Sequence, residues 1–69
     1  MFKTKWKYFL IIQELDKGLQ ITQELFSKSQ GEAEKEAETV LALYSQKCDN
    51  HTLLEAHIMK KLILVRKGE

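Results

Sequence analysis

Residues 29–48 read SQGEAEKEAETVLALYSQKC and decide the fold, because they have the pattern of an amphipathic helix. Ser29 and Glu32 have the spacing of a capping box, in which the Ser side chain accepts a hydrogen bond from the backbone N–H three residues on. Apolar residues then recur three or four positions apart, which places them on one helical stripe. The stripe consists of Ala33, Ala37, Val40, Leu41, Tyr44 and Cys48. We therefore predict a helix over residues 30–48 with one side that must pack on other elements.

The two stretches before this helix predict a β-hairpin. Residues 2–15 and 19–27 both alternate between apolar and polar side chains, which is the period of a strand. Asp16 and Gly18 lie between them and are typical of a turn, because Gly takes a positive φ without steric cost and Asp can close a turn with its side chain. A loop of two or four residues puts Leu19, Ile21 and Leu25 on the same face as Tyr8, Leu10 and Ile12. We prefer this register because it keeps one face apolar.

The C-terminal stretch, residues 52–66, fits a strand or a second helix. As a helix, Leu54, Ile58, Leu62 and Val65 form a stripe; as a strand, the stretch ends in an apolar run that matches residues 9–12. This match favours the strand, since two strands that are apolar on both faces suit one another as neighbours. We predict a single domain over residues 1–69 of the α+β class, with order strand, strand, helix, strand. The sheet order is 2-1-3, and the helix covers the face that carries Trp6, Tyr8, Leu10 and Ile12.

One helix covers one face of such a sheet, so the other face is expected to be open. The apolar residues predicted on this face form a candidate interface with a partner or a second copy: Phe9, Ile11, Phe26, Met59, Ile63 and Val65. The ends of the first and third strands bring cations together as a basic rim: Lys5, Lys7, Arg66 and Lys67. We expect a homodimer that stacks two open faces; a dedicated heterologous partner and a C-terminal helix that closes the face are the alternatives. We expect Ile11→Asp to abolish association and leave the fold intact.

Composition limits the class of protein further. The chain has 69 residues, of which 43% are apolar and 30% are charged, and its net charge is +1. This composition is ordinary for a globular domain and gives no global signature for nucleic acid or membrane binding. A core of this size contributes only about 3–5 kcal/mol, so association is expected. A single Cys excludes an internal disulfide and fits a reducing interior. With no apolar run long enough for a signal or a membrane span, we expect a cytoplasmic protein.

Sequence motifs for catalysis and for cofactors are absent. Cys48, His51 and His57 have donor atoms that suit zinc, but no fourth ligand is evident. Cys48 and His51 also lack a third group that would orient them as a nucleophile and its base. The chain contains no phosphate-binding glycine loop. We therefore expect no enzymatic activity, no catalytic residues, no metal and no cofactor. Nucleic acid binding through the basic rim is the alternative to protein binding, although lysines and aromatic residues at the N-terminus have opposite parity.

The layout resembles that of small accessory proteins of phages and prophages of Gram-positive bacteria. The resemblance is carried by KYFLIIQELDKG at residues 7–18, a second strand, and SKSQGEAEKEAETVLALY at residues 27–44. It covers residues 7–45 as a pattern of elements and transfers no functional residue. It implies a non-enzymatic viral protein in the host cytoplasm that binds and blocks one host protein, such as a component of anti-phage defence.

Overall fold

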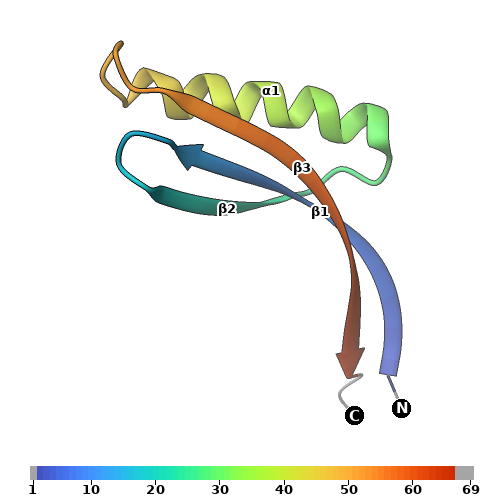
Figure 1. Cartoon of the computed structure of the whole chain (residues 1–69). Helices are drawn as coiled ribbons and strands as arrows, with labels where there is room; N and C mark the ends of the chain where they lie inside the picture. Colours follow the sequence, from blue (N-terminus) through green and yellow to red (C-terminus); the bar gives the residue numbers. More distant parts are fainter. Residues whose placement is uncertain (1, 67–69) are drawn as a thin grey trace.

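The computed structural model describes residues 2–66 and shows a three-stranded sheet with one helix on one face (Figure 1). The elements in chain order are β1 (Phe2–Glu14), β2 (Leu19–Leu25), α1 (Gln30–Gln46) and β3 (Leu54–Arg66). The strand order is β2-β1-β3, and β1 pairs antiparallel with both neighbours. The predicted α+β class, element order and sheet order are confirmed, and the C-terminal stretch is a strand.

The hairpin between β1 and β2 has the predicted register. Its loop is residues 15–18, and Gly18 adopts a φ of +66° that favours glycine. The Lys17 and Gly18 N–H groups donate to the carbonyl of Glu14 at 3.2 and 2.9 Å. This loop sets Leu25 opposite Tyr8 and Ile21 opposite Ile12. The apolar side chains of both strands therefore share the face that meets α1.

The predicted stripe of α1 forms the core with Tyr8, Leu10 and Ile12 of β1. Ser29 is the N-cap, and its side chain accepts a hydrogen bond from the Glu32 N–H at 3.3 Å. Ala33 and Ala37 are buried, so the first half of the helix lies close to the sheet. The buried cluster consists of Tyr8, Leu10, Ile12, Leu25, Ala33 and Ala37, with Val40, Leu41, Tyr44, Leu54, Ala56 and Ile58 packed at its edge. Trp6 was expected beneath the helix; that prediction is wrong, since its side chain is 58% exposed.

The predicted elements run one or two residues too long at the hairpin end of β1, the end of β2, the end of α1 and the start of β3. For β2 the reason is visible. The N–H groups of Phe26 and Ser27 donate to the Glu36 carboxylate at 2.9 Å, and the Ser27 hydroxyl donates to it at 2.6 Å. Because these amides are bound to α1, they are not available to extend the ladder with β1.

The end of β2 leaves part of β1 and β3 as a two-stranded ribbon. Residues 8–14 of β1 pair with β2, whereas all of β1 pairs with β3, from Phe2 opposite Arg66 to Glu14 opposite Leu54. We call residues 2–7 and 61–66 the β1–β3 arm. The arm projects beyond α1 and β2 and bends away from the helix (Figure 1). It makes the molecule elongated: the Cα radius of gyration is 14.5 Å, against about 11 Å for a compact chain of this length.

Candidate interaction surfaces

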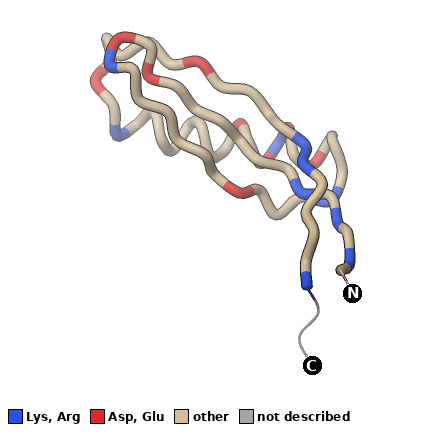
Figure 2. Tube along the Cα trace, turned by 60° about the horizontal axis from the view of Figure 1, so that its bottom comes forward, with Lys and Arg blue, Asp and Glu red and all other residues tan. Residues whose placement is uncertain are grey.

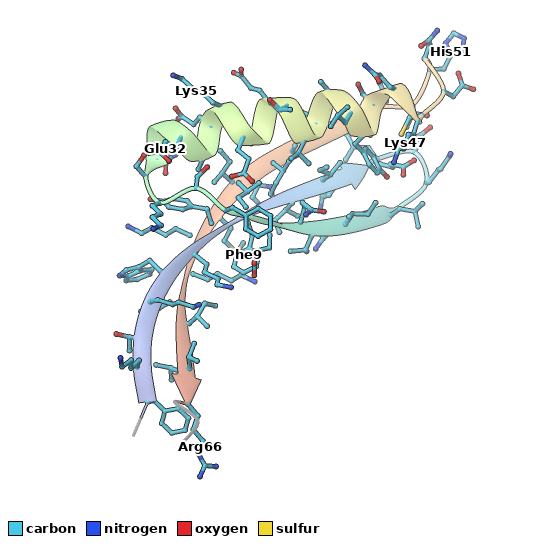
Figure 3. The ribbon with its side chains drawn as sticks, turned by 180° about the vertical axis from the view of Figure 1, so that it is seen from behind. Phe9, Glu32, Lys35, Lys47, His51 and Arg66 are labelled. Atoms are coloured by element: carbon cyan, nitrogen blue, oxygen red, sulfur yellow. The ribbon has the colours of Figure 1, made fainter. Side chains whose placement is uncertain are left out.

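The sheet face away from α1, which we call the open face, has no helix or strand over it within residues 2–66. Residues directly opposite in an antiparallel pair share a face. Phe9 pairs with Met59, Lys5 with Ile63 and Lys3 with Val65, so these residues lie together on the open face. Phe9 lies where the arm joins the body of the protein (Figure 3). Five of the six apolar residues predicted for this face are on it: Phe9, Ile11, Met59, Ile63 and Val65.

The open face is less apolar than the sequence suggested. Ile11 is only 4% exposed, so its expected role as a surface contact is wrong, and Ile11→Asp would place a carboxylate in a packed site. Phe26 lies beyond the last residue of β2 and is therefore outside the sheet. Met59 and Val65 are the exposed members, while Phe9 and Ile63 are half-buried. Around Phe9 and Met59 the face carries polar side chains from β2, among them Thr22 and Glu24.

The predicted basic rim lies at the arm, but its members do not share a face. Lys5 and Lys7 have open-face parity, whereas Arg66 is opposite Phe2 on the other side. The Lys7 ammonium is 2.8 Å from a carboxylate oxygen of Glu24, which neutralises it. Lys67 lies outside the described residues. In Figure 2 the arm has Lys and Arg positions only, whereas the Asp and Glu positions lie on the rest of the molecule, together with further Lys positions. Residues 2–7 and 61–66 carry Lys3, Lys5, Lys7, Lys61 and Arg66 and no carboxylate.

The other face of the arm, which we call the arm's helix-side face, is apolar and exposed. It carries Phe2, Trp6, Leu62 and Leu64, all of the same parity as the core residues Tyr8 and Leu10. The Lys60 ammonium lies 5.0 Å from the centroid of the Trp6 ring, a contact that holds a cation against an aromatic face. Sequence reasoning missed this surface because it placed Trp6 beneath the helix. The shorter apolar pattern of β2 was the available signal.

A groove lies between α1 and β3 and has a volume of about 320 Å³. Its floor is apolar, formed mainly by Leu10, Ala37, Leu41 and Ile58, with Ala56 beside them. Glu34 and Glu38 of α1 lie along one side, and residues 56–58 of β3 form the other. The groove therefore combines an apolar floor with two carboxylates.

The polar side chains near the core pair with one another. Glu14 is buried and accepts a hydrogen bond from the Tyr44 hydroxyl, while the Lys17 ammonium lies 3.6 Å from its other oxygen. The hydrogen bond to Glu14, followed by burial, raises the pKa of Tyr44 to about 12. The Ser27 hydroxyl and the Phe26 N–H lower the pKa of Glu36 by stabilising its carboxylate. These pairs connect elements of the fold, and their carboxylates already have donors.

The candidate zinc donors are not brought together. Among residues 2–66 no three His, Cys, Asp or Glu side chains are grouped closely enough to hold a metal ion. The His51 N–H donates to the side chain of Asp49 at 3.1 Å in the turn after α1, far from the arm (Figure 3). His57 lies on the open face opposite Ile11.

Comparisons with family models, curated proteins and solved structures return no match for this chain. In the part that the structure describes, no helix is long and apolar enough to cross a membrane.

Proposed function

We propose that the protein is a non-enzymatic binding protein that blocks a host protein by covering part of its surface with the open face of its sheet. The observation that carries the proposal is the open face itself, where apolar side chains of β1 and β3 lie beside lysines with no element over them in residues 2–66. Exposed apolar groups of this kind on a small protein mark an interaction surface. The resemblance of residues 7–45 to phage accessory proteins makes a bacterial host protein, such as a defence component, the expected target.

The chemistry of the face defines its partner. Met59 is 37% exposed and lies opposite Phe9, so the two form the apolar centre. The Lys61 ammonium lies 5.3 Å from the centroid of the Phe9 ring, and Lys5 extends the cationic side toward the arm. Apolar contacts at the centre supply affinity, while charges at the edge speed association and select the partner. The expected target surface is an apolar patch bordered by carboxylates.

The test is capture of partners from a lysate of a Gram-positive bacterium with the tagged protein, with and without nuclease. Met59→Asp places a charge at the centre of the open face, and Leu43→Asp places the same charge on the outer side of α1, where the Leu side chain is 57% exposed. We expect one stoichiometric protein that survives nuclease, is lost with Met59→Asp and is retained with Leu43→Asp. Equal capture by both variants, with both folded by circular dichroism, would contradict the proposal.

Nucleic acid binding is the second candidate, and the specific observation in its favour is the arm without carboxylates. Lys3, Lys5 and Arg66 are exposed cations on a ribbon that projects from the body, and a two-stranded ribbon has the width to enter the major groove. Release of counterions would give an affinity that falls steeply with salt. Capture that disappears with nuclease, together with a salt-dependent affinity for duplex DNA that Arg66→Glu weakens, would favour this candidate over protein binding.

A further inference from the structure

The arm's helix-side face lacks a cover within the described chain. Leu64 is 64% exposed, and Trp6, Phe2 and Leu62 on the same face are exposed as well. A two-stranded ribbon with apolar groups in water is marginally stable by itself. These four side chains expose roughly 500 Å² of apolar surface per copy. The face therefore needs an occupant with an apolar surface.

The outer edge of β3 has no partner strand within residues 2–66. β3 is the terminal strand of the sheet order β2-β1-β3 and pairs only with β1, over thirteen residues from Leu54 to Arg66. A long edge strand presents unpaired N–H and C=O groups and is a template for another strand. Lys60 and Lys61 near its centre are charges of the kind that limit unrestricted pairing at a sheet edge. The free edge thus lies directly beside the apolar face of the arm.

The groove between α1 and β3 complements the arm in both shape and charge. Its floor is apolar and its helix side carries Glu34 and Glu38. The arm's helix-side face carries apolar side chains and one cation, Arg66, and no carboxylate, because the four lysines of the arm have open-face parity. Two such faces packed against each other would bring the Arg66 side chains of both copies together with no acid between them, which is unfavourable. This face against the groove of another copy brings Arg66 to the carboxylates of Glu34 and Glu38. Charge therefore selects the groove, and not a second arm, as the occupant of this face.

We propose that two copies of the chain pair antiparallel through the outer edges of β3, so that the arm of each copy lies along the α1–β3 groove of the other. A two-fold axis makes the contact reciprocal, as in most homodimers. Antiparallel pairing sets residues 61–66 of one β3 beside the first half of the other, next to Ala56 and Ile58 at the groove. Leu62 and Leu64 enter the groove, Trp6 packs behind them, and Arg66 lies near the carboxylates of Glu34 and Glu38.

This dimer has the size of a weak but specific interface. Covering the apolar face of both arms removes on the order of 1,000 Å² of apolar surface, which is the lower limit for specific association. The result is a continuous sheet of six strands with both helices on one side. The open faces of the two copies remain free, so the dimer does not depend on the function proposed above.

The first experiment follows association through Trp6, which is the only Trp in the chain and lies in the arm. Sedimentation velocity between about 1 and 300 µM is combined with Trp fluorescence, and both are expected to change together, with a blue shift as the dimer forms. Leu64→Asp is expected to raise the dimer Kd about 100-fold, because each dimer buries two carboxylates beside Glu34 and Glu38. Leu43→Asp, at a similarly exposed site away from the groove, is expected to change it less than about twofold.

The possible results distinguish the proposed dimer from a monomer and from a dimer that forms through the open faces. A wild-type protein that stays monomeric at the highest concentration would overturn the proposal. So would a dimer that Leu64→Asp leaves intact. Thr22 is an exposed residue of β2 on the open face; if Thr22→Arg dissociates the dimer and Leu64→Asp does not, the copies stack through their open faces instead.

The second experiment exchanges charges between copies. Arg66→Glu and Glu38→Lys are each expected to weaken self-association about tenfold, because either change places like charges together at both contacts of the dimer. Mixing the two variants is expected to restore association to within about twofold of the wild type, since each arm then meets a groove of opposite charge. A damaged fold in either variant cannot produce such a rescue. If the mixture associates no better than the separate variants, the arm does not lie against the groove.

Discussion

Ile12 and Ile21 offer a matched pair for testing where the core lies. They are directly opposite each other on the helix-side face of β1 and β2, but Ile12 is 2% exposed, whereas Ile21 is 39% exposed. Replacing either by Val removes one methylene group. The two variants therefore differ only in how much of that group is buried.

The magnitude follows from burial. A buried methylene contributes about 0.8 kcal/mol, and the small cavity left behind adds a few tenths, so Ile12→Val is expected to cost about 1 kcal/mol. At Ile21 part of the group already contacts water and no closed cavity forms, so the cost is expected to be about 0.5 kcal/mol or less. In so small a protein the first value is a substantial part of the total stability.

The assay is urea unfolding followed by circular dichroism, with all variants at one protein concentration because association changes apparent stability. With a slope of about 1 kcal/mol per molar urea, the midpoint is expected to fall by about 1 M for Ile12→Val and by about 0.5 M or less for Ile21→Val. Equal shifts, or a larger shift for Ile21→Val, would refute the assignment of Ile12 to the centre of the core.

Two further predictions concern the paired carboxylates and their pH dependence. Hydrogen bonds from Ser27 and Phe26 lower the pKa of Glu36 from 4.5, so the stabilising effect of its carboxylate is present above pH 4.5 and is lost as the pH falls through the lower folded value. Glu36→Gln should therefore reduce the loss of stability in acid, measured as urea midpoints from neutral pH downward. An unchanged acid profile would contradict this. The pKa of Tyr44 is raised from 10.0 to about 12 by Glu14, so the contribution of Tyr44 to stability is complete below pH 10 and is lost as the pH approaches 12. A spectrophotometric titration of the folded protein should show one tyrosine that ionises near pH 12 and that Tyr44→Phe removes. Persistence of that ionisation in the variant would refute the assignment.

Local patterns in the sequence determined the elements and their order. Ser29 at a capping position, Gly18 in a turn and the alternation in β1 all act over a few neighbouring residues, so they can be identified without the tertiary structure. The register of β1 and β2 followed as well, because a slip of one residue would have turned Leu25 and Ile21 away from the core.

Only the tertiary structure decided where the elements end relative to one another. β2 stops at Leu25 because the Glu36 carboxylate binds the next two amides from ten and nine residues away, and this leaves residues 2–7 without a partner on one side. The same alternation that predicts a strand at Trp6 cannot show whether a helix lies above it, since cover depends on contacts between distant segments. The exposed arm and the groove between α1 and β3 are therefore properties of packing, and the candidate binding surfaces come from them.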